Sequence, residues 1–215
     1  MDVLLQWLQP LFADAFTLWG SPTSWLEVLA FVLAVAMVVY NIRVNPIAWP
    51  LAIISSLLYF ALFWKSRLYG EASLQIFFAA IAFWGWWQWL RGRQDDGSLL
   101  RVRLLPARIR WVLLATFIVA WAAMGAFLKT FTDTDVAWAD ALPTTGSVIG
   151  QWLLGRKHVE TWPVWVMVNL ASVVLFAYKG LWLTVLLYAV FIPMSVAGWR
   201  AWLRLASTLN RGPAS

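Results

Sequence analysis

Cysteine is absent from this 215-residue chain, and histidine occurs once, as His158. The lack of thiols excludes disulfides, thiolate metal sites and cysteine nucleophiles. His158 follows Arg156 and Lys157 in a short basic segment, which is a poor setting for a general base. The chain also lacks the zinc-protease, nucleophile-elbow and phosphate-loop motifs. We therefore expect no enzyme, with no catalytic residue, no metal and no cofactor.

Charged residues are scarce as well, at 12% of the chain against 62% for hydrophobic residues. A soluble domain of this length needs more charge to cover its surface. Seven stretches contain no Asp, Glu, Lys or Arg: residues 28–42, 44–64, 72–90, 111–128, 141–155, 161–178 and 180–199. Most are close to the ~20 residues that cross a bilayer as a helix, and none alternates as a barrel strand does. Because backbone groups in lipid must bond within the segment, we expect an all-α integral membrane protein with seven transmembrane helices.

The net charge of +6 could indicate a nucleic-acid partner, but the placement of the charges gives a better explanation. Seven spans divide the loops between two sides of the membrane. One side holds most of the basic residues: Arg43, Arg91, Arg93, Arg101, Arg103, Arg108, Arg110, Arg156, Lys157, Arg200, Arg204 and Arg211. The positive-inside rule places this side in the cytoplasm, with the C-terminus inside and the N-terminus outside. We expect the lipid bilayer as a partner and no nucleic acid, and we expect the basic loop 91–109 to lie against anionic headgroups.

The N-terminal segment has apolar residues on one helical face over residues 3–18, with Pro10 between them. This pattern predicts a short helix at the membrane interface, and a frayed terminus is the equal alternative. Asp2 and the lack of a basic stretch before the first span argue against a signal peptide.

An internal repeat appears when the sequence is shifted by 113 residues. Matched pairs at this single offset include Trp25 with Trp138, Arg43 with Arg156, Trp49-Pro50 with Trp162-Pro163, Gly85-Trp86 with Gly198-Trp199, and Trp89 with Trp202. Tryptophan is abundant, with 18 residues, so one match would mean little. Several matches at one offset, with both dipeptides, indicate a true repeat.

The repeat covers the first three and the last three predicted spans, and the span at 110–129 has no counterpart. One extra crossing makes two three-helix units parallel, which gives a 3+1+3 parallel-repeat, SWEET-like transporter arrangement. The predicted segments are an N-terminal interfacial segment 1–24, a first repeat 25–90, a basic loop 91–109, a linker helix 110–129, a second repeat 138–203 and a cytoplasmic tail 204–215. The interface between the repeats is the expected path of a small polar solute.

Polar and aromatic side chains inside the spans are candidates for this path, because they are costly in lipid. They share helical faces with spacings of three, four or seven residues. The candidates for substrate binding are Gln75, Gln151, Trp162, Trp165, Asn169, Tyr59 and Tyr188. A buried carboxamide needs partners for its donors and its acceptor, and indole faces suit a planar ring. The competing interpretation is that small polar residues such as Thr144 and Ser147 only pack helices or bond the backbone.

Several motifs together resemble the PnuC family of vitamin transporters over residues 25–203. They are Trp49-Pro50, Leu68-Tyr69-Gly70-Glu71-Ala72, Gly85-Trp86-Trp87-Gln88-Trp89, Gln151-Trp152-Leu153-Leu154-Gly155-Arg156-Lys157 and Glu160-Thr161-Trp162, with Trp165 and Asn169. Thr161 departs from the family pattern, in which an Asn precedes the Trp.

The resemblance implies a bacterial inner-membrane carrier of nicotinamide riboside that works by facilitated diffusion and relies on intracellular phosphorylation to trap its substrate. It also raises a homotrimer as the assembly. The alternative within this fold is a carrier of thiamine, riboflavin or a sugar. A membrane scaffold or receptor without transport is the alternative from another class, and the polar faces inside the spans argue against it.

Overall fold

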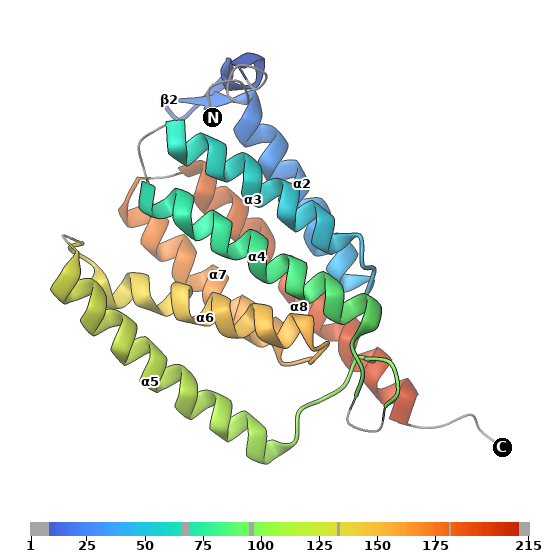
Figure 1. The fold of residues 1–215 in the computed structure, drawn as a ribbon. Helices are drawn as coiled ribbons and strands as arrows, with labels where there is room; N and C mark the ends of the chain where they lie inside the picture. The colour runs from blue at the N-terminus through green and yellow to red at the C-terminus, as the bar shows by residue number, and fades with distance from the viewer. Residues whose placement is uncertain (1–8, 66–68, 95–96, 133, 181, 211–215) are drawn as a thin grey trace. The chain divides into compact units, whose positions relative to one another are not determined.

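The computed structural model describes residues 9–65, 69–94, 97–132, 134–180 and 182–210. In these residues the chain forms a 3₁₀ helix η1 (Gln9–Phe12), strands β1 (Asp14–Leu18) and β2 (Ser21–Ser24), and the helices α2 (Trp25–Ile42), α3 (Ala48–Lys65), α4 (Tyr69–Arg91), α5 (Ala107–Phe131), α6 (Ala137–Gly155), α7 (Thr161–Tyr178) and α8 (Trp182–Asn210) (Figure 1). The described part therefore has the seven expected helices. Contacts divide the chain into two compact units, 1–87 and 88–215, so that the boundary falls within α4.

Four of the described helices are long and apolar enough to cross a membrane: Trp25–Ile42, Ala107–Phe131, Thr161–Tyr178 and Trp182–Thr208. A shorter apolar helix covers Ala48–Leu62. The helix in the middle of the sequence is α5, and large apolar side chains such as Trp111, Val119 and Phe131 are exposed on it. Such a surface is suited to lipid rather than to water.

The N-terminal segment differs from the expected interfacial helix. From Asp14 onward it is an antiparallel hairpin, in which Leu18 pairs with Ser21 across the two-residue turn Trp19-Gly20. Both turn residues have positive φ, at 45° and 85°, as the type I′ hairpin turn requires. The helix prediction is therefore wrong for residues 14–18, because the turn at Gly20 favours a hairpin. Its residues 3–8 lie outside the described part of the chain.

The first unit contains α2 and α3, which pack along each other. Ser24 and Glu27 form a capping box at the start of α2: the Ser24 backbone N–H donates to Glu27 Oε2 over 2.7 Å, and the Glu27 N–H donates to Ser24 Oγ over 3.3 Å. These bonds satisfy backbone donors that the first helical turn leaves free. The α4 helix meets α3 where the Trp49 ring covers Gly85, a position at which a Cβ atom would overlap the ring.

The turn between α2 and α3 is a Schellman motif. The Val44 N–H donates to the Asn41 carbonyl over 3.0 Å, and the Asn45 N–H donates to the Tyr40 carbonyl over 2.9 Å. Val44 takes the left-handed conformation that this motif requires, with a φ of 54°. A β-branched residue rarely adopts this conformation, because its side chain crowds the backbone.

The turn between α6 and α7 has the same motif at the 113-residue offset. The Lys157 N–H donates to the Leu154 carbonyl over 3.0 Å, and the His158 N–H donates to the Leu153 carbonyl over 2.9 Å. Lys157 has a φ of 57°, close to that of Val44. The helix that follows each turn carries Pro in its first turn, where a missing N–H costs little. The two segments therefore share local backbone structure as well as sequence.

The second unit is built around α7, which packs against both α6 and α8, while α5 packs against α6. Trp162 of α7 covers Gly198 of α8, as Trp49 covers Gly85 in the first unit. On the other side, Trp138 of α6 covers Gly125 of α5, and the Trp121 indole N–H donates to the Trp138 carbonyl over 3.0 Å. Small residues at these points let the helices approach closely.

Candidate functional site

The seam between α6 and α7 contains the predicted site residue Trp165. Gly146 and Gly150 of α6 form a small-xxx-small pair, and Val168 and Trp165 of α7 pack over them. A Cβ at Gly150 would lie 3.1 Å from the Trp165 ring. Next to Gly150, the Gln151 Oε1 atom is buried and has no hydrogen-bond partner in the described part of the chain. Trp165 therefore packs on this seam, and the residue that follows Gly150 in the sequence carries an unpaired amide acceptor.

Asn169 contacts α8 on the seam between α7 and α8. Its Nδ2 atom donates to Ser195 Oγ over 3.1 Å, and its side chain is 1% exposed. The Oδ1 atom is buried and has no partner among the residues that the structure describes. Because an unpaired buried acceptor costs ~1–3 kcal/mol, such an atom is a candidate for a bond with a solute.

Trp162 has a packing role in this geometry. Its side chain is only 2% exposed, and its ring fits between Gly198 and the ring of Trp202, whose centroid lies 5.5 Å away at a near-perpendicular angle. The Trp49–Gly85 contact in the first unit repeats the contact between Trp162 and Gly198. Trp165 is half-buried, so it has more free surface than Trp162 for a planar solute.

The other predicted site residues are half-buried. Tyr188 of α8 stacks on Phe176 of α7, with the ring centroids 5.4 Å apart and the planes 8° from parallel. Tyr59 of α3 and Gln75 of α4 belong to the first unit. Substrate contact by each of the seven residues remains a prediction.

A feature that the sequence prediction missed is the attachment of the loop before α5 to the turn between α6 and α7. The Arg103 N–H donates to the Lys157 carbonyl over 3.1 Å, and the Val159 N–H donates to the Arg103 carbonyl over 3.0 Å. Leu100 and Val102 of the loop are buried. The alternation of apolar and basic residues from 100 to 103 is a strand-like pattern that could have indicated this contact.

Side chains strengthen the attachment. Both carboxylate oxygens of Glu160 accept from the Leu105 N–H, over 3.1 and 3.2 Å, and Arg110 Nε lies 2.9 Å from Glu160 Oε1. Lys157 Nζ donates to the Leu100 carbonyl over 3.1 Å and lies 5.0 Å from the centre of the Trp89 ring. Burial lowers the pKa of Lys157. The loop therefore makes specific protein contacts in addition to any contact with headgroups.

His158 is enclosed by the same contacts and is 3% exposed. Burial lowers its pKa to about 4, and the positive charges of Arg103 and Arg156 act in the same direction. A backbone hydrogen bond with Arg103 opposes the shift. The imidazole is therefore neutral near pH 7, and its place in the turn is structural.

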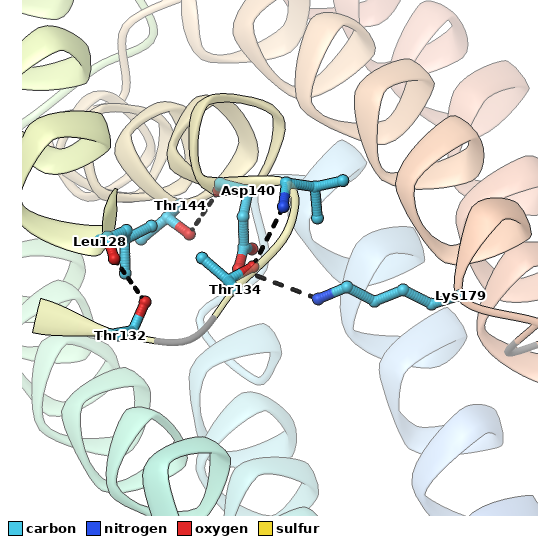
Figure 2. A network of polar contacts seen from close by, with 7 residues as sticks. Leu128, Thr132, Thr134, Asp140, Thr144 and Lys179 are labelled. Carbon is cyan, nitrogen blue, oxygen red and sulfur yellow. Dashed lines mark hydrogen bonds and ion pairs between the residues drawn. The ribbon is translucent and has the colours of Figure 1, made fainter. Parts of the chain in front are cut away.

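Polar contacts also join the opposite ends of α6 and α7 (Figure 2). Lys179 Nζ, just after α7, lies 3.9 Å from Asp140 Oδ2 in the first turn of α6. The Thr144 hydroxyl donates to the Asp140 carbonyl over 2.8 Å, and the Thr132 hydroxyl donates to the Leu128 carbonyl over 2.6 Å. Thr144 therefore bonds its own helix, as the packing interpretation of small polar residues expects.

Comparisons with known proteins match this chain to a family of transporters and to a solved structure. The family model described as nicotinamide mononucleotide transporter matches residues 24–204. The chain belongs to this transporter family. The predicted membership of the PnuC group is thereby confirmed, and the protein is a multi-pass membrane protein with a transport role.

Relatives in this family differ in the solute that they carry. The riboflavin/roseoflavin transporter RibM of Streptomyces davaonensis is 26% identical over 92% of this chain and 92% of its own length. The nicotinamide riboside transporter PnuC of Escherichia coli is 24% identical over 87% of this chain and 88% of its own. The crystal structure of the vitamin B3 transporter PnuC matches with a TM-score of 0.71 at 22% identity, over 86% of this chain and 83% of that one, which supports the fold.

Proposed function

We propose that the protein carries nicotinamide riboside across the bacterial inner membrane by facilitated diffusion, and that phosphorylation inside the cell traps the solute. The observation that carries this proposal is the Asn169 carboxamide, whose oxygen is buried and unpaired on a seam of the central helix. Trp165 is half-buried one helical turn from Asn169. A pyridinium ring suits an indole face, and the carboxamide and hydroxyl groups of the solute suit amide partners.

The proposed architecture is a 3+1+3 arrangement of seven transmembrane helices. The Schellman turns and the Trp–Gly contacts that recur at the 113-residue offset support two equivalent three-helix repeats. A single helix between them, α5, makes these repeats parallel in the SWEET-like manner. The positive-inside rule supports an outside N-terminus and a cytoplasmic C-terminus. A homotrimer stays a prediction from the family resemblance.

The proposed solute site uses Trp165, Asn169, Gln151 and Tyr188 from the second unit. Substrate contact by Gln75 and Tyr59 of the first unit stays a prediction from the sequence. We assign Trp162 a secondary role, because its ring is enclosed by helix packing. Passive transport is proposed because the spans carry no Asp, Glu, Lys or Arg near their centres, the groups on which a proton relay depends.

Uptake of labelled nicotinamide riboside into proteoliposomes tests the proposal. We expect uptake that stops at equal concentrations inside and outside, and that does not respond to a proton gradient. Trp165→Ala and Asn169→Ala should each weaken binding about tenfold or more, while Trp199→Ala, an exposed tryptophan on α8, serves as the matched control. No uptake above empty vesicles, with folded protein present, would overturn the proposed substrate.

Riboflavin is the second candidate solute, because RibM matches this chain at 26% identity over 92% of both lengths. Its isoalloxazine ring is larger than a pyridinium ring and carries an imide N–H donor. A ligand that binds the folded state raises thermal stability, so a thermal-shift panel with riboflavin, thiamine and nicotinamide riboside separates the candidates.

A further inference from the structure

The Asn169 carboxamide is held at one end and unpaired at the other. Its Nδ2 atom donates to Ser195 Oγ over 3.1 Å, and its Oδ1 atom has no partner in the described ranges. Both residues are almost fully buried, at 1% and 3% exposure. Native proteins rarely leave a buried acceptor unpaired, so this oxygen is available to accept a hydrogen bond from a ligand.

Helix packing alone does not require this pair. On α7, Asn169 lies two helical turns after Trp162, and on α8 Ser195 lies one turn before Gly198, so both contacts belong to the same seam. The first repeat has the same Trp–Gly contact between Trp49 and Gly85. At the offset of 113, however, Asn169 and Ser195 correspond to Ser56 and Ala82. The close helix contact is thus made without a carboxamide in the first repeat.

We propose that Ser195 is a positioning residue that sets which solutes the carrier accepts. By accepting the Asn169 amide hydrogen, Ser195 leaves the Asn169 carbonyl oxygen as the free group, so the solute must supply an N–H or O–H donor there. This inference rests on the proposed solute site. A carboxylate solute would bring acceptor oxygens against an acceptor, and a site built around a specific hydrogen bond discriminates strongly against such a solute.

The test compares two solutes that differ at one group, which is a neutral donor in the first and an anionic acceptor in the second. Nicotinamide riboside carries a carboxamide N–H, and nicotinic acid riboside carries a carboxylate. Each is used to compete with labelled nicotinamide riboside for uptake into proteoliposomes containing the wild type, Ser195→Ala or Ser195→Thr. We expect the wild type to prefer the amide, and Ser195→Ala to lose about tenfold of that preference because the freed carboxamide can turn. Ser195→Thr keeps a hydroxyl and should restore the preference.

The ratio of the two affinities distinguishes positioning from a merely structural role. Equal weakening of both solutes in Ser195→Ala, or an unchanged ratio, would overturn the inference while leaving the proposed function intact. If Ser195→Ala does not fold, Ser195→Cys replaces it, since a thiol keeps the volume but accepts weakly. If the wild type carries riboflavin instead, riboflavin and its N3-methyl derivative form the matched pair. The ratio of their affinities in the wild type and in Ser195→Ala then tests the role of Ser195. A wild type that binds neither pair overturns both proposals.

Discussion

Replacing Gly198 by Ala is predicted to destabilise the second unit, although Ala normally favours a helix. A Cβ at this position would lie 2.5 Å from the six-membered ring of Trp162, well inside van der Waals contact. The ring cannot move away freely, because Trp202 packs against it at 5.5 Å between centroids and Trp202 is itself fully buried. Overpacking of this kind costs up to ~3 kcal/mol, and the helix preference of Ala returns ~1 kcal/mol. We therefore expect a net loss of ~2 kcal/mol.

The free energy of unfolding in mixed detergent micelles measures this effect. Gly85→Ala should be destabilising in the same way, because Trp49 covers Gly85 as Trp162 covers Gly198. Ala197→Ser, at an exposed position beside Gly198, is the control and should change stability by less than ~1 kcal/mol. The double variant Trp162→Phe/Gly198→Ala should lose less than the sum of the single variants, since the smaller ring leaves room for the Cβ. A Gly198→Ala protein as stable as the wild type, or strict additivity, would refute the packing argument.

Three further predictions concern the two Schellman turns and the loop attached to the second. Val44→Gly should raise the free energy of unfolding by up to ~1 kcal/mol, because it relieves the strain of a left-handed β-branched residue. Lys157→Gly should lower the free energy of unfolding, because it removes the hydrogen bond from Lys157 to the Leu100 carbonyl. Chemical denaturation of the two variants compares these effects. Glu160→Gln should speed hydrogen exchange at the Leu105 amide severalfold, since a neutral acceptor holds that N–H less strongly. The buried His158 has a pKa of about 4 against 6.5 in the unfolded chain, so the unfolded state binds more protons between these two pH values. The free energy of unfolding should therefore be highest above pH 6.5 and fall as the pH drops toward 4. His158→Gln should flatten this pH dependence in unfolding curves.

The fold was largely predictable because its signals are local. Uncharged stretches mark the helices, and the Trp-Pro and Gly-Trp dipeptides mark equivalent positions 113 residues apart. The N-terminal hairpin was missed because apolar residues on one helical face also fit a short strand, and the turn at Trp19-Gly20 decided between the two. The loop 91–109 was predicted from its charge alone, so its buried residues Leu100 and Val102 were overlooked.

The candidate site was predictable as a set of residue types and not as a set of contacts. Periodicity placed Trp162, Trp165 and Asn169 on one face of α7, and it treated the two tryptophans as equal. The structure separates them, because Gly198 and Trp202 enclose the Trp162 ring while Trp165 stays half-buried. Which face of a helix meets which neighbour depends on how the helices pack, and periodicity within one helix carries no such information.

By itself, the sequence determined that the chain enters a membrane, where its helices run, that two segments repeat at a fixed offset, and to which family it belongs. These properties follow from hydropathy and motif spacing, which are read along the chain. Only the tertiary structure decided that Asn169 bonds Ser195, 26 residues away, and that a basic loop pairs with the turn at Lys157. Such bonds depend on the rotation and approach of whole helices, and these are fixed by side-chain packing over many residues at once.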